Sequence, residues 1–213
     1  MRKLTLLCAL ATLGVAANAQ LIYQDPGTGD NAWGVIDAFS FYDDFTVGSP
    51  GWEIDRIETY EYYGDADSFG DTYRVDIWTA PSDLGGSIVA GTYTHTDVSV
   101  GPIGGYGFET FAVGFQLDAT PGCDGQGLVL KPGTYWLRFW AGDSGVGYFW
   151  YNANVGAPNG SSAYVDGFGY SESWAGQSFD MSFKMEGCVV PEPATLLAMG
   201  AGLAALAARL RRK

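Results

Sequence analysis

The chain has 213 residues, with 24 acidic side chains against 11 basic ones and 31 glycines. Six of the basic residues lie at the two ends, so the body, residues 20–190, carries five basic and 23 acidic side chains, a formal charge of −18. A surface this acidic repels phosphate backbones, which excludes nucleic acid as a partner and leaves cations or neutral sugars. About 170 residues suffice for one domain with a sizeable core.

The first 19 residues are typical of a secretory signal peptide. A basic pair at the start precedes a short apolar run, and Ala17 and Ala19 form a small-x-small cleavage site. We therefore expect a mature chain that begins at Gln20. The alternative is a lipoprotein leader that uses Cys8, but Leu7 stands where such leaders need a small residue.

Two cysteines remain after this cleavage, Cys123 and Cys188. An exported chain enters an oxidising compartment in which disulfides form and persist, so the sequence predicts a bridge between them. Closing a loop of this length stabilises a protein by roughly 4 kcal/mol on the loop-entropy model. Two separate buried thiols are the alternative.

Short runs of alternating apolar and polar residues predict an all-β body. Clusters of Gly, Pro, Asn and Asp bound these runs, as half-buried antiparallel strands require. Apolar faces recur in the runs 73–79, 111–117, 135–139 and 179–185, and further strands are expected at 38–47, 52–63, 87–98, 147–152 and 163–170. The spacing favours a single domain over residues 20–188, a two-sheet antiparallel sandwich that is jelly-roll-like.

A turn is expected between residues 130 and 134. Pro132 presets its φ angle for a turn and Gly133 supplies a positive φ, which predicts that the strands 128–130 and 134–140 are linked as a hairpin.

The last 25 residues, 189–213, differ in kind from the body. Val190-Pro191-Glu192-Pro193 is followed by an apolar run, 194–208, and by a basic end, 209–213. As a helix the run rises about 22 Å, less than the roughly 30 Å hydrocarbon core, so a transmembrane segment over 194–210 is a marginal anchor. Basic residues stay cytoplasmic, which places the acidic body outside.

This tail resembles the PEP-CTERM sorting signal of Gram-negative bacteria, which is also described as the C-terminal domain of ice-binding proteins. The resemblance rests on Pro191, Glu192 and Pro193, followed in order by the apolar span and the arginine-rich end. It implies that an exosortase recognises the motif while the chain is transiently anchored in the inner membrane. Cleavage near the motif then passes the body to the cell surface or the medium. Such proteins are typical of organisms that make exopolysaccharide, so exopolysaccharide is a candidate partner.

The body is also similar to β domains that often precede this tail. The similarity lies in the segments 43–46 (Asp-Asp-Phe-Thr), 51–52 (Gly-Trp) and 133–137 (Gly-Thr-Tyr-Trp-Leu). It implies a fold and no activity.

The sequence predicts no catalytic residues. The only histidine, His95, lies in a strand-like run, and no Gly-x-Ser-x-Gly elbow precedes a helix. We therefore expect a structural or interaction role, with a carbohydrate-binding module as the alternative and a glycoside hydrolase as a remote one. Carboxylates for hydrolysis are available in number, but the sequence singles out no pair at the required separation: Asp43, Asp44, Glu58, Glu61 and Glu109.

One acidic segment has the spacing of a calcium loop. Asp65, Asp67, Asp71 and Asp76 place oxygen ligands around Gly70, although the segment lacks the flanking helices of an EF-hand. A loose calcium loop and a solvated acidic turn are the two alternatives, and no other cofactor is expected.

Three tryptophans are candidate glycan-stacking residues. Trp136 and Trp140 alternate with the apolar face of their strand, and Trp78 does the same on another strand. Outward aromatic rings of this kind stack on pyranose rings. The alternative is that both faces of these strands are buried.

Overall fold

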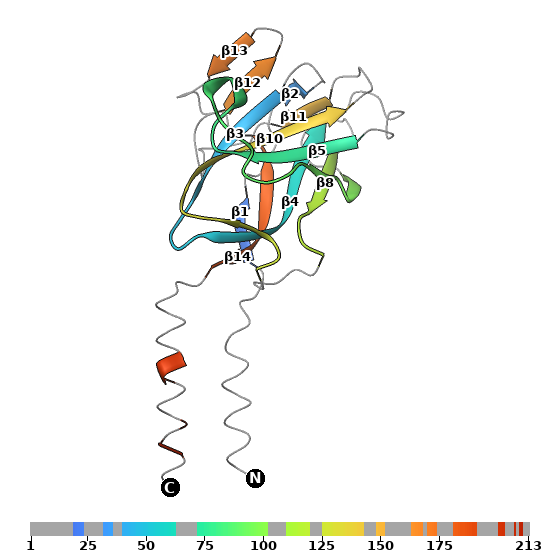
Figure 1. The fold of residues 1–213 in the computed structure, drawn as a ribbon. Coiled ribbons are helices and arrows are strands. Elements are labelled where there is room, and N and C mark those ends of the chain that lie inside the picture. The colour runs from blue at the N-terminus through green and yellow to red at the C-terminus, as the bar shows by residue number, and fades with distance from the viewer. Residues whose placement is uncertain are drawn as a thin grey trace.

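The computed structural model describes residues 19–23, 32–35, 40–62, 72–101, 110–119, 125–142, 148–151, 163–167, 170–173, 181–190, 200–202, 207 and 209–210. Within these residues the chain is almost entirely β-structure, arranged in two antiparallel sheets (Figure 1). The predicted all-β class and the two antiparallel sheets are thus confirmed. The jelly-roll connectivity stays a prediction.

The first sheet is built around β4, its longest strand. On one edge, β4 pairs with β14 along residues 52–59 and with β11 at residues 61–62. On its other edge, β4 pairs with β9 along residues 52–54 and with β8 along residues 56–62. Strands β1, β2 and β7 pair with β14, β11 and β8 respectively. The strands of this sheet are β1 (Ala19–Tyr23), β2 (Ala32–Val35), β4 (Trp52–Tyr62), β7 (Asp97–Gly101), β8 (Thr110–Gln116), β9 (Leu128–Leu130), β11 (Tyr148–Tyr151) and β14 (Phe183–Val189).

The second sheet has the order β13-β12-β3-β10-β5-β6. A short 3-10 helix, Ser82–Leu84, follows β5. The strands of this sheet are β3 (Ser40–Val47), β5 (Thr72–Trp78), β6 (Tyr93–Thr94), β10 (Gly133–Gly142), β12 (Ala163–Gly167) and β13 (Tyr170–Ser173).

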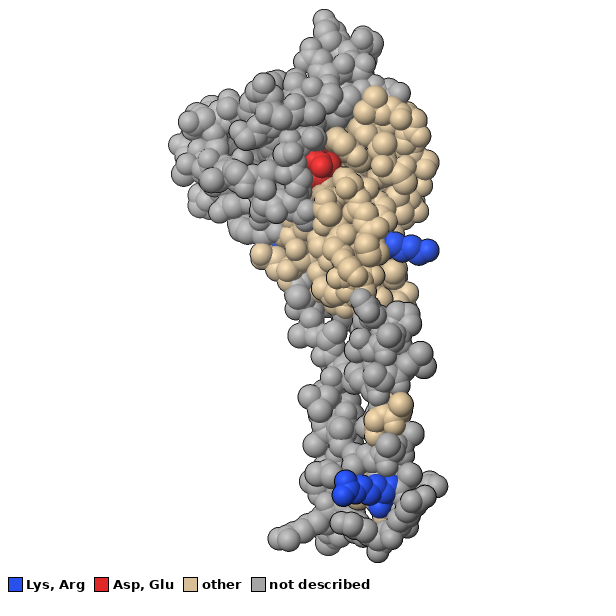
Figure 2. All heavy atoms as spheres, turned by 90° about the vertical axis from the view of Figure 1, so that its left-hand side faces the viewer, with Lys and Arg blue, Asp and Glu red and all other residues tan. Residues whose placement is uncertain are grey.

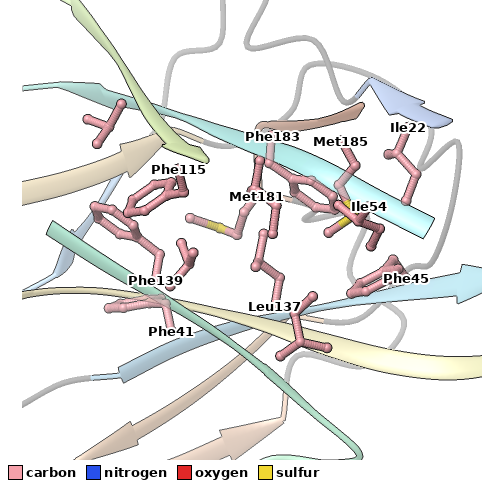
Figure 3. Close-up of a cluster of buried hydrophobic side chains, with 14 of the residues drawn as sticks. Ile22, Phe41, Phe45, Ile54, Phe115, Leu137, Phe139, Met181, Phe183 and Met185 are labelled. Atoms are coloured by element: carbon pink, nitrogen blue, oxygen red, sulfur yellow. The ribbon is translucent and has the colours of Figure 1, made fainter. Parts of the chain in front are cut away.

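The core lies between the two sheets (Figure 3). Aromatic rings meet across it: Phe45 and Phe183 have ring centres 6.3 Å apart, as do Phe115 and Phe139. Most of the apolar faces predicted from alternation are confirmed, because the following residues are buried in this core: Tyr73, Val75, Ile77, Val113, Phe115, Leu137, Phe139, Met181, Phe183 and Met185. Leu117 and Tyr135 are half-buried, and Thr79, at the end of the predicted face 73–79, is exposed. The burial of Phe111 and Phe179 lies outside the described features.

The strand predicted at 87–98 is wrong. Its residues divide between the two sheets: β6 pairs with β5 of the second sheet and β7 with β8 of the first. The chain crosses at His95 and Thr96, whose N–H groups donate to the carbonyl oxygens of Tyr73 and Gly114 at 3.0 and 2.8 Å. The Nδ1 atom of His95 also accepts from the Tyr73 N–H at 3.2 Å, so this histidine stabilises the crossover. The strand predicted at 163–170 is likewise two paired strands, β12 and β13.

The hairpin predicted around Pro132 and Gly133 is also wrong. A bend at Pro132 joins the two strands, but β9 pairs with β4 in the first sheet, whereas β10 pairs with β3 and β5 in the second. Gly133 is the first residue of β10 and does not have the positive φ that the sequence predicts. The bend therefore carries the chain from one sheet to the other. A local bend signal does not decide whether the two strands beside it bond to each other.

Within the described residues no helix is long and apolar enough to cross a membrane. Residues 1–18 and most of 194–210 lie outside the described residues. The signal peptide and the transmembrane anchor therefore stay predictions.

Candidate functional site

The outer face of the second sheet carries a ladder of alternating tryptophan and arginine side chains. Strand β5 contributes Arg74 and Trp78, and the adjacent β10 contributes Arg138 and Trp140. These positions alternate with core residues of the same strands, so the two-residue period turns them away from the core. We call these four residues the tryptophan–arginine ladder.

Neighbouring members of the ladder lie within cation–π distance. The guanidinium carbon of Arg138 lies 5.4 Å from the centre of the Trp78 ring and 5.1 Å from that of Trp140, and the guanidinium carbon of Arg74 lies 4.6 Å from the Trp140 ring. Such contacts stabilise by about 0.5–1 kcal/mol each at exposed sites. The rings of Trp78 and Trp140 are therefore already in stacking contact with arginine side chains of the same chain.

A buried carboxylate holds the ladder together. Asp76 lies opposite Arg138 in register, and its side chain is 0% exposed. Its Oδ2 atom lies 2.6 Å from an Nη atom of Arg138 and accepts a hydrogen bond from Nε1 of Trp140 at 3.3 Å. A carboxylate buried in this way needs the arginine as its counter-charge.

Part of this outer face is covered by the segment that follows β5. Tyr42 of β3 points away from the core, yet it is fully buried. Its hydroxyl donates to the Oγ atom of Ser82 at 3.1 Å, and its ring meets Trp78 edge-on at 6.0 Å. At this point both faces of the sheet are covered.

Trp136 has a different position on the same face. It lies in register between Trp78 of β5 and Asp44 of β3 and is half-buried. Among the described residues, no arginine stacks on its ring. The glycan-stacking role of Trp78, Trp136 and Trp140 stays a prediction, and Trp136 is the member of this set whose ring the ladder does not use.

The predicted calcium loop falls largely outside the described residues, which do not include Asp65, Asp67 or Asp71. Asp76 is described, and it lies in the middle of β5, where it pairs with Arg138. Its carboxylate is the counter-charge of Arg138, so Asp76 lies in a strand and not in a calcium loop.

Three other carboxylates meet in the structure and were not singled out from the sequence. Ligand oxygens of Glu53, Asp55 and Asp118 all lie within 4.8 Å of one another, and all three residues are buried. Glu53 and Asp118 lie more than sixty residues apart in the chain, and no local motif joins them. Carboxylate oxygens suit a hard cation such as Ca²⁺.

Strand pairing explains why these carboxylates meet. The register between β4 and β14 shifts at Asp55, which leaves a bulge in β4. The carbonyl oxygen of Asp55 accepts from the N–H groups of Leu117 and Asp118 at 2.8 and 3.2 Å. The Oε1 atom of Glu53 accepts from the N–H groups of Gly125 and Gly127 at 2.7 and 3.1 Å. The acidic cluster thus fastens the connection between β8 and β9 to β4.

Cys188 is buried beside this cluster, with its Sγ atom 4.0 Å from Oε2 of Glu53. Cys123 lies outside the described residues. The Cys123–Cys188 bridge stays a prediction.

The carboxylates considered for hydrolysis are dispersed among the described strands. Asp43 and Asp44 are neighbours on β3, so they point to opposite faces of the sheet. Asp43 is buried on the core side and accepts a hydrogen bond from the Met181 N–H at 3.0 Å. Glu58 lies 3.2 Å from Arg56, and Glu109 falls outside the described residues.

An ion-pair network lies on the first sheet around Arg56. Its guanidinium donates to both oxygens of Asp97 at 2.8 Å and to Glu58 at 3.2 Å. The hydrogen bonds to Asp97, opposed by burial and supported by Glu58, raise the pKa of Arg56. The same bonds lower the pKa of Asp97 to about 2 from its ordinary 3.8. The network links β4 to β7 across β8.

The body ends where the sorting motif begins. Val189 pairs with Trp52 at the end of β14, and the N–H of Val190 donates to the carbonyl oxygen of Gly51 at 2.9 Å. Pro191 is the next residue, so the motif follows the last strand of the domain without a linker.

Residues 189–213 match the family model of the PEP-CTERM protein-sorting motif. The resemblance of the tail is thus confirmed, and the chain is an exported protein that is sorted through its C-terminal end. No curated protein matches the chain.

Proposed function

We propose that this protein is processed by exosortase at its PEP motif and then serves at the cell surface or in the extracellular matrix, in a structural or interaction role without catalysis. The observation that carries this proposal is the direct passage from β14 into the motif at Val190. A tail attached without a linker to a folded sandwich suits an anchor that holds the body outside and is then removed. The ladder supports a structural role, since its charged and aromatic groups bind one another.

Fractionation of cells that express a motif variant tests the sorting step. The double substitution Pro191→Ala, Glu192→Ala should leave uncleaved protein in the inner membrane. Thr195→Ala, in the same tail but outside the motif, is the matched control and should mature normally. Normal maturation and export of the double variant would refute processing at this motif.

Carbohydrate binding is the second candidate function, and the position of Trp136 favours it. Its ring lies on the outer face of the second sheet, beside Trp78 and outside the ladder. Exopolysaccharide is the ligand class that we propose for this site. Trp136→Ala should then weaken binding on a glycan array at least tenfold, about 1.4 kcal/mol, without lowering the melting temperature.

Trp140→Ala provides the matched control for that experiment. It removes a ladder member that is bonded to Asp76, so it should lower stability while leaving glycan binding of the folded fraction intact. If the array detects no glycan for the parent chain, the carbohydrate-binding candidate fails. Turnover of a polysaccharide that one carboxylate substitution abolishes would instead establish the hydrolase alternative.

A further inference from the structure

Four segments of the body meet at the end from which the tail leaves. Gly51 lies at their centre, because Val190 bonds to it and a Cβ atom at this position would meet the Leu130 carbonyl oxygen at 2.7 Å. The start of β1 joins them, since Gln20, the expected first residue of the mature chain, is paired with Glu186 of β14. We define the base as residues 20–21, 48–52, 130–134 and 189–190.

The base differs in charge from the rest of the body. Its residues include one charged side chain, the exposed Lys131, whereas the body as a whole carries a formal charge of −18. In Figure 2 the described lower part of the body is tan with blue atoms at its edges. Apolar surface is also present, since Val189 is 48% exposed and Trp52 is half-buried.

The other four basic residues of the body are engaged elsewhere. Arg56, Arg138 and Lys184 each lie in an ion pair, and Arg74 stacks on the ring of Trp140. Among the described residues Lys131 has no such partner. Its ammonium group is therefore the basic group of the body that is available to an external anion.

The length of the tether brings the base to the bilayer. Only residues 191–193 separate Val190 from the apolar run that begins at Ala194. Even when fully extended, this stretch spans at most about 14 Å. The headgroup layer on each side of a bilayer is itself several ångströms thick, so the base lies at the headgroups whenever the run is inserted.

We propose that the base docks on the outer surface of the inner membrane while the tail is anchored, with Lys131 against anionic lipid headgroups and the exposed apolar surface of Trp52 and Val189 at the interface. This docking rests on the anchoring proposed above. Tryptophan and lysine are the side chains that favour this layer. The remaining acidic surface is repelled by anionic lipid, so the body stays seated only while the tail holds it. Removal of the tail then releases the body outward.

Fluorescence quenching of the full chain in vesicles tests this docking. The chain would be reconstituted in 3:1 phosphatidylcholine–phosphatidylglycerol vesicles that contain a headgroup-linked quencher. Thr134→Cys places a dye at the base, and Thr94→Cys places it at the level of Trp140, six residues and about 20 Å further along β10. Both threonines are exposed, and the parent chain treated with the same dye gives the background from native cysteines.

Docking predicts strong quenching at position 134 and little at position 94. Lys131→Glu should reduce quenching at 134 in the anionic vesicles, whereas Lys131→Arg should retain it. A single lysine contributes about fivefold in affinity for an anionic surface at low salt, so the effect of Lys131→Glu should fade as salt rises.

The outcomes separate this inference from the anchoring on which it rests. If the chain floats with the vesicles but both dyes are quenched equally, or Lys131→Glu has no effect, anchoring stands and the docking is refuted. Energy transfer between dyes at position 134 of two chains, without lipid quenching, would assign the base to a second copy and would also refute it. If the chain does not float with the vesicles at all, the anchoring itself fails.

Discussion

Replacing Arg138, at the centre of the ladder, should lower the free energy of unfolding, because it leaves the carboxylate of Asp76 buried without a counter-charge. Arg138→Met deletes the counter-charge of Asp76, whose side chain is 0% exposed, together with two cation–π contacts. Loss of one partner of a buried pair costs about 3–5 kcal/mol, most of it from the charge left behind. The single variant should therefore lose about 4 kcal/mol in its free energy of unfolding.

The second substitution decides the mechanism. Asp76→Asn removes the charge but keeps an oxygen that can accept from Trp140 Nε1. The double variant Arg138→Met, Asp76→Asn should thus cost only about 2 kcal/mol, mainly the lost cation–π contacts, and should be more stable than the single variant. Urea unfolding at 25 °C, followed by tryptophan fluorescence and by circular dichroism, gives the four free energies of the cycle.

A surface pair provides the matched control. Lys184→Met breaks the ion pair with Glu186, whose side chains are 26% and 35% exposed, and should cost less than about 1 kcal/mol. If Asp76→Asn gives no recovery on the Arg138→Met background, burial of Asp76 does not control the stability of the ladder and this reasoning is wrong.

Three further changes test the core, the bulge and the surface network. Phe139→Ala should cost about 3–5 kcal/mol in urea unfolding, because its fully buried ring packs on Phe115 across the two sheets; a cost below 1 kcal/mol would contradict the assigned core. Gly187→Ala should lower the melting temperature markedly, since a Cβ atom there would meet the backbone of β4; an unchanged melting temperature would rule out this close approach. The pKa of Asp97, about 2, lies below its ordinary value, so its contribution is complete above about pH 4 and is lost as the pH falls toward 2. Asp97→Asn should therefore destabilise at pH 6 by less than about 1 kcal/mol, because the side chain is half exposed, and should have no effect at pH 2; an equal loss at both values would refute the pairing with Arg56.

Alternation along the chain predicted the core faces well because it depends on a local property. The core face of each strand follows from the two-residue period whatever strands pair beside it, and the structure buries this face in β5 (Tyr73, Val75, Ile77), β10 (Leu137, Phe139) and β14 (Phe183, Met185). The strand at 87–98 was mispredicted for the opposite reason. Its alternation continues through His95, but hydrogen bonds to two different sheets divide it there.

The sequence predicted which residues of the candidate site point outward but not which of them contact one another. Outward tryptophans and arginines could be placed on β5 and β10, since each position follows from the two-residue period. That Trp140 lies beside Arg74, and Arg138 beside Asp76, depends on the register between two strands about sixty residues apart. The carboxylate cluster gave no local signal, because it forms where the bulge in β4 meets the connection between β8 and β9.

The sequence by itself determined the export and sorting of this protein and the face that each strand turns to the core. Each of these features depends on a pattern of residues that are close together in the chain: an apolar run beside basic ends, a PEP motif and a two-residue period. Tertiary structure alone decided that Trp78 and Trp140 stack with arginines of the same chain and that Lys131 lies at the base beside the start of the tail. Such contacts join residues far apart in the chain, so their existence depends on strand pairing and register, which no local pattern encodes.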